Sequence, residues 1–168
     1  RGKAKKNADS ALSAVRLLEG AESSNFETGL VQLGTCLGAN SFKPDKESHC
    51  DAAWLWGNEL WITHEAKSEQ SSGKDVSVKD VRQANTQLDA LAKLRDVDPP
   101  TGSFSTLITD RTIGGSDPRS HARPHLYLLS TDEIHTVAVD VADACADIFA
   151  WGTGKSDADY FGRVGEVL

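Results

Sequence analysis

Residues 51–67 have the sequence DAAWLWGNELWITHEAK, which contains a clear structural pattern. Two apolar runs flank the pair Gly57-Asn58, whose residue types tolerate a positive φ, and this pattern predicts a β-hairpin with a two-residue turn. Asp51 begins the first strand, and Glu65 and Lys67 end the second. Because alternate residues of a strand point to the same face, we expect Glu65 and Lys67 to lie together.

The acids lie at the ends of a hairpin whose two strands are strongly apolar. Carboxylates beside tryptophan and isoleucine lose hydration free energy unless a positive charge lies between them. A divalent cation such as Mg²⁺ or Mn²⁺ prefers oxygen ligands, so Asp51 and Glu65 are candidate metal ligands. The purely structural alternative is an ion pair at a strand end, in which Asp51 or Glu65 binds Lys67.

Length and composition indicate one ordinary globular domain of 168 residues, with no apolar run of the roughly 20 residues that a membrane helix needs. The chain begins with arginine and contains no methionine, so we interpret it as a piece of a longer protein. Three cysteines without a CxxC pair favour a reducing, cytoplasmic setting. The formal charge of −7 argues against tight nucleic-acid binding by this domain alone, although other domains could supply it.

Before the hairpin, the sequence predicts a solvated basic leader at residues 1–6 and a helix over 8–22. The pattern Ser24-x-x-Glu27 then predicts the start of a second helix, which ends near Gly38. Glu27 keeps two interpretations, a capping-box glutamate or a third acid directed at the metal. The polar residues 40–49 are expected to form a loop.

After the hairpin, Ser77 caps an expected helix that ends near residue 94, and Gln83 and Gln87 lie one turn apart beside its buried stripe. Glutamines are common on exposed helix surfaces, so they are expected at the surface unless the hairpin packs against this face.

The C-terminal part predicts strands at 104–109 and 125–129, the latter being the last core strand, and a helix over 134–149 that begins with the pattern Ser130-x-x-Glu133. A long loop, 110–124, joins the two strands. Flexible arginines beside glycines suit phosphate contact, although surface arginines commonly only solubilise a protein. The candidate substrate-binding residues in this loop are Arg111, Arg119 and Arg123.

With these elements in this order, residues 24–149 resemble the PD-(D/E)XK superfamily of restriction-endonuclease-like nucleases. The resemblance implies an α/β fold of three layers, α/β/α, around a mixed central sheet. It also implies that Asp51, Glu65 and the main-chain carbonyl of Ala66 hold the divalent metal, and that Lys67 is the catalytic lysine. Glu27 matches the acid that many members carry on their first helix, and Gln83 matches a glutamine found in some branches.

Two positions differ from family patterns. Cys50 precedes Asp51 where proline is frequent, and Gln87 stands where one exonuclease branch carries tyrosine.

These observations divide the chain into a leader and helix (1–23), a nuclease-like core (24–150) and a C-terminal appendage (151–168). The expected function is metal-dependent endonucleolytic cleavage of DNA, within a larger restriction, anti-phage defence or repair protein. Expected partners are DNA, other domains of that protein and a second copy in a homodimer, and no membrane. One alternative is a catalytically silent module that binds nucleic acid or protein. Another is a phosphodiesterase acting on small nucleotides.

Overall fold

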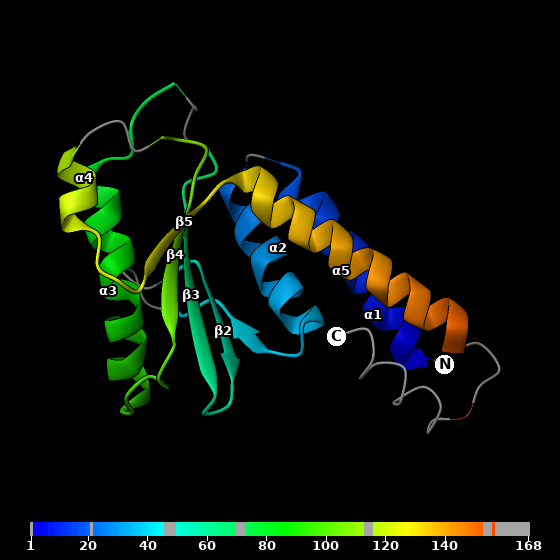
Figure 1. The fold of residues 1–168 in the computed structure, drawn as a ribbon. Coiled ribbons are helices and arrows are strands. Elements are labelled where there is room, and N and C mark those ends of the chain that lie inside the picture. The colour runs from blue at the N-terminus through cyan, green and yellow to red at the C-terminus, as the bar shows by residue number, and fades with distance from the viewer. Residues whose placement is uncertain are drawn as a thin grey trace.

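The computed structural model describes residues 2–20, 22–45, 50–69, 73–112, 116–152 and 156, with the side chains of 2–4 and 116 left aside. It is an α/β fold in which helices cover both faces of a five-stranded mixed sheet (Figure 1). The elements are α1 (Gly2–Leu18), α2 (Ser23–Cys36), β1 (Asn40–Phe42), β2 (Ala52–Trp56), β3 (Leu60–Ala66), α3 (Val78–Arg95), β4 (Phe104–Ile108), α4 (Ser116–His121), β5 (Leu126–Leu129) and α5 (Thr131–Gly152). No helix in the described ranges is long and apolar enough to cross a membrane.

The strand order is β1-β2-β3-β4-β5, and the pairing changes from antiparallel to parallel at β3. β1, β2 and β3 are antiparallel neighbours, whereas β3, β4 and β5 run parallel. The carboxyl ends of the three parallel strands therefore lie at one edge of the sheet. Crevices outside such ends are common ligand sites in α/β proteins.

The predicted hairpin is present as β2 and β3, but its turn is longer than expected. Trp56 pairs with Leu60, and the N–H of Glu59 donates to the carbonyl of Trp56 at 2.9 Å. The connection is thus three residues rather than two. Gly57 has a φ of 55° and supplies the left-handed conformation that the turn requires.

α2 covers one face of the sheet, and α1 and α5 pack beside it (Figure 1). The predicted apolar stripe of α2 is buried, with Phe26, Leu30 and Leu33 fully enclosed. Gly34 allows close approach, because a Cβ at this position would lie 2.3 Å from Cδ1 of Trp54. The indole N–H of Trp54 also donates to the carbonyl of Leu30 at 2.9 Å, so α2 is held firmly against β2.

α3 lies on the opposite face, with α4 beside it (Figure 1). Its predicted stripe, which includes Val81 and Leu88, is buried. The predicted cap is also present, since Ser77 Oγ accepts a hydrogen bond from the Asp80 N–H at 3.1 Å. This helix faces β3 and therefore reaches the end of the hairpin.

Several local expectations were wrong. The leader is helical from Gly2, because it continues the helix whose residues Ala8, Ala11 and Ala14 are buried. The expected loop 40–49 contains strand β1, which pairs with β2, and the loop 110–124 contains the short helix α4.

Two further expectations concern the C-terminal part. β5 is an edge strand rather than a core strand, since it pairs with β4 alone and leaves Tyr127 and Leu128 exposed. The expected appendage 151–168 lies outside the described residues except for 151, 152 and 156.

Candidate active site

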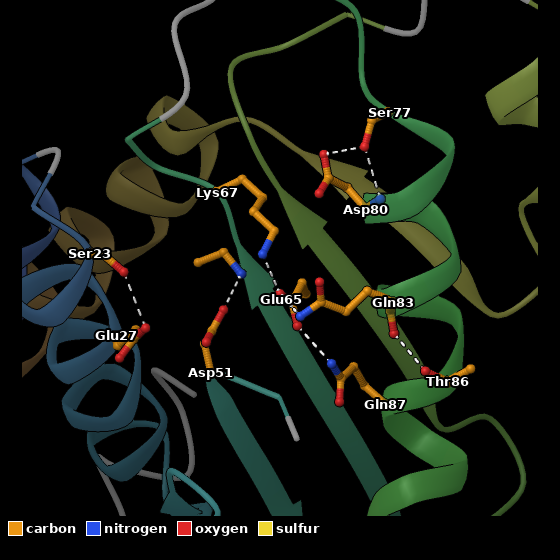
Figure 2. Close-up of polar contacts among 11 residues, drawn as sticks. Ser23, Glu27, Asp51, Glu65, Lys67, Ser77, Asp80, Gln83, Thr86 and Gln87 are labelled. Atoms are coloured by element: carbon orange, nitrogen blue, oxygen red, sulfur yellow. Dashed lines mark hydrogen bonds and ion pairs between the residues drawn. The ribbon is translucent and has the colours of Figure 1, made fainter. Parts of the chain in front are cut away.

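The hairpin brings Asp51 beside the end of β3, as the sequence predicts. The N–H of Asp51 donates to the carbonyl of His64 at 2.8 Å. Asp51 Oδ2 in turn accepts a hydrogen bond from the N–H of Ala66 at 2.7 Å. Figure 2 shows the Asp51 carboxylate between α2 and the Glu65 side chain. The backbone of β3 therefore orients Asp51 toward the second predicted acid.

Glu65 is 1% exposed, and three side chains donate to its carboxylate. Oε1 accepts from Lys67 Nζ and from Gln83 Nε2, both at 2.6 Å. Oε2 accepts from Gln87 Nε2 at 2.7 Å (Figure 2). The Glu65 carboxylate is thus held in one orientation by its own strand and by two successive turns of α3.

The pKa values of these groups reflect burial with too little compensating charge. Burial, together with the charge of Glu65, raises the pKa of Asp51 to about 7, although the hydrogen bond from Ala66 acts in the opposite direction. Burial also raises the pKa of Glu65 despite its contact with Lys67. For Lys67, burial alone would lower the pKa, but the hydrogen bond and the charge of Glu65 outweigh it and raise the pKa. A bound cation would offset the electrostatic repulsion between the carboxylates of Asp51 and Glu65.

Glu27 lies on α2, on the other side of Asp51 (Figure 2). Its carboxylate accepts from Ser23 Oγ at 3.2 Å and forms an ion pair with Lys43. The capping-box interpretation is wrong, because Glu22 occupies the N-cap position. The charge of Glu27 contributes to the raised pKa of Asp51, so the two acids interact electrostatically.

The groups here that could hold a divalent metal are the carboxylates of Asp51 and Glu65 and the Ala66 carbonyl. Within the described part of the chain, no group of three or more His, Cys, Asp or Glu side chains could hold an ion. Mg²⁺, however, is often bound by one or two carboxylates and keeps several water molecules. Asp51, Glu65 and the Ala66 carbonyl would suffice for such an ion, and the mutually destabilising carboxylates suit it.

The three predicted arginines do not form one cluster. Arg111 and Arg119 line a common cavity of about 440 Å³ near the carboxyl ends of β4 and β5. Arg123 instead forms an ion pair with Asp89 of α3, with Nη1 and Oδ2 2.9 Å apart. The expected phosphate contacts therefore divide into a shared cavity and a separate surface pair.

The sequence patterns did not assign three further residues to the site. Gln87 was expected at the surface, yet it is 1% exposed and binds Glu65. The four-residue spacing of Gln83 and Gln87 was the signal that could have assigned both to one acid. Asp80 and Lys43, whose charges act on the site, carry no such signal.

Comparison with known proteins adds no relative. No protein-family model, curated protein or solved structure matches this chain. Its function is therefore inferred from its own residues and contacts.

Proposed function

We propose that the protein is a metal-dependent nuclease that hydrolyses DNA phosphodiester bonds, with a core of the PD-(D/E)XK type. The observation that carries this proposal is the convergence of Asp51, Glu65 and Lys67 at one end of a hairpin, where Glu65 is buried and Asp51 is half-buried. The mixed sheet with helices on both faces is compatible with a three-layer nuclease fold. An ion pair that served stability alone would not need a second, half-buried acid beside it.

Each residue has a definite task in this proposal. Asp51, Glu65 and the carbonyl of Ala66 hold Mg²⁺ or Mn²⁺, which when bound supplies charge neutralisation at the phosphate and lowers the pKa of a water molecule. Lys67 is 22% exposed at its side chain. Its ammonium group has three donors, so it can keep its bond to Glu65 while donating to a phosphate oxygen.

Gln83 and Gln87 act on Glu65 rather than on the substrate in this scheme. Each donates to a different carboxylate oxygen, and together they resist rotation of the Glu65 side chain. Groups that orient a metal ligand commonly contribute to metal affinity and activity. Replacing Gln83 with alanine should therefore lower activity only partially, because Gln87 and Lys67 still hold the acid.

We further propose that this domain belongs to a longer protein. A net charge of −7 suits a cytoplasmic module whose partner domains, or a second copy, supply most of the DNA affinity. Restriction, anti-phage defence and repair proteins are such settings.

The proposal is tested by cleavage of supercoiled and linear DNA with Mg²⁺, Mn²⁺ or EDTA. We expect metal-dependent cleavage that falls at least about a hundredfold in Glu65→Ala and in Lys67→Ala. Lys93→Ala is the matched control, because it removes the same charge from an exposed position at the far end of α3. Cleavage that persists in clean Lys67→Ala protein would contradict the proposed site.

An inactive wild-type protein calls for a second measurement. Titration with Mn²⁺ in a calorimeter separates a working metal site from a silent binding module. Binding that disappears in Asp51→Asn would leave a metal site that needs further domains for cleavage. No binding would favour the silent module.

A further inference from the structure

The cavity that contains Arg111 and Arg119 opens at the same edge of the sheet as the proposed catalytic residues. The N–H of Lys67 donates to the carbonyl of Ile108 at 2.8 Å, and the N–H of Thr109 donates to that of Leu129 at 2.9 Å. The cavity thus lies one to two strands along this edge from Lys67. Neighbouring strands are about 4.8 Å apart, so the separation is on the order of 10 Å.

The acids of this cavity already have partners. Asp110 Oδ1 accepts from the N–H of Thr131 at 2.9 Å and from its hydroxyl at 2.6 Å. Glu133 Oε2 accepts from the N–H of Ser130 at 2.7 Å and from its hydroxyl at 3.1 Å. One oxygen of each carboxylate is therefore engaged in capping the start of α5, where the helix dipole favours a negative charge.

Unlike the acids, the two arginines of the cavity have no carboxylate partner among the described residues. The Nε atom of Arg111 is buried and has no hydrogen-bond partner. Among the described residues, neither Arg111 nor Arg119 forms an ion pair with a carboxylate, whereas Arg123 pairs with Asp89. A buried donor without an acceptor is unfavourable, and a guanidinium group binds phosphate oxygens with two parallel hydrogen bonds.

We propose that the Arg111–Arg119 cavity is a phosphate-binding subsite, which holds a phosphate of the DNA strand close to the one that is cleaved. This inference rests on the proposed nuclease function. Leu128 lines the same cavity and is 39% exposed, so it offers apolar contact to the sugar next to that phosphate. The subsite would place the strand across the carboxyl edge of β3, β4 and β5, with the cleaved bond at Lys67.

The test measures binding separately from cleavage. A fluorescently labelled DNA oligonucleotide is titrated with full-length protein in EDTA, at several salt concentrations, and its anisotropy is recorded. We expect Arg111→Gln and Arg119→Gln each to weaken binding about tenfold at low salt and to reduce the salt dependence by about one counterion. Arg95→Gln is the matched control, because it removes the same charge from an exposed position in the last turn of α3, and it should bind as the wild type does. Arg119 is exposed, so its variant remains informative if Arg111→Gln fails to fold.

Two further arms identify the source of the phosphate. A deoxynucleoside monophosphate and the corresponding nucleoside compete against the labelled strand. The subsite is supported if the monophosphate displaces the labelled strand and the nucleoside does not, and if the monophosphate competes more weakly than the unlabelled strand does. A monophosphate that binds more tightly than the strand would overturn the assignment to DNA. Equal binding by all variants, or an equal loss in Arg95→Gln, would overturn the subsite itself.

The two proposals fail in different ways. DNA cleavage by wild-type protein, with unchanged binding in the Arg111 and Arg119 variants, would refute the subsite and leave the nuclease standing. Arginine-dependent binding without cleavage under any metal condition would count against the nuclease and retain the phosphate site.

Discussion

Replacing Asp51 with asparagine should stabilise the metal-free protein while removing its metal site. Asparagine has nearly the same shape, and its side-chain carbonyl can still accept the hydrogen bond from Ala66. The substitution removes only the negative charge that burial and Glu65 disfavour. A residue placed for function rather than stability should behave in this way, because its charge is unfavourable until a cation binds.

The size and sign of the effect follow from the pKa of Asp51, which rises from 3.8 to about 7 on folding. The folded state then holds the proton more tightly than the unfolded state, so this group lowers stability progressively as pH rises from about 4 to 7, and the loss is complete above 7. At about 1.4 kcal/mol per pH unit, the upper limit is about 4 kcal/mol. We expect Asp51→Asn to raise the free energy of unfolding by about 2–4 kcal/mol at pH 8, and by less than about 1 kcal/mol at pH 4.

The assay is urea denaturation in EDTA at pH 4, 6 and 8. Glu59→Gln is the control, because it removes one negative charge from an exposed position in the turn of the same hairpin. In a parallel thermal melt, Mg²⁺ or Mn²⁺ should stabilise the wild type and leave Asp51→Asn unchanged. A variant that is less stable than the wild type at pH 8, or a gain of equal size in Glu59→Gln, would refute the reasoning.

Two other changes test the packing and the orientation of the site. Gly34→Ala should destabilise the fold by about 1–3 kcal/mol, because the added Cβ meets Trp54; urea melts beside Gly20→Ala, which meets nothing within 4 Å, provide the comparison. Gln87→Leu should weaken Mn²⁺ binding about tenfold in calorimetry, since Glu65 loses the donor to Oε2. Unchanged Mn²⁺ affinity would reduce that glutamine to a packing role.

Local signals succeeded where neighbours in the sequence complete the interaction. The pattern Ser130-x-x-Glu133 forms a true capping box, with the Glu133 N–H bonded to Ser130 Oγ at 3.1 Å and the Ser130 N–H bonded to Glu133 Oε2. The same pattern at Ser24 does not, because α2 begins at Ser23 with Glu22 as its N-cap, and Glu27 pairs with Lys43, sixteen residues away. The same Ser-x-x-Glu motif therefore forms a capping box at one helix and not at the other, where the glutamate has an ion-pair partner far away in the sequence.

The grouping of the candidate site residues also depends on local spacing in one case and on distant contacts in another. The alternation of β3 is enough to place Glu65 and Lys67 together, and the hairpin is enough to bring Asp51 to them. Sequence spacing could not separate Arg123 from Arg111 and Arg119, because the distinction depends on Asp89, a residue of another element. A long, mobile side chain takes its partner from whatever the fold places nearby.

The hairpin, the buried faces of the helices and the three charged residues at one strand end can be predicted from local sequence patterns, because these features follow from periodicity over a few residues. Local patterns do not predict that Gln83 and Gln87 hold Glu65, that β5 lies at the sheet edge, or that two arginines share a cavity. These features depend on where α3 and the loops pack against the sheet. Burial then raises the pKa of Asp51 most, and the neighbouring charge of Glu65 adds to it, because the fold both removes water from the carboxylate and places the two acids together.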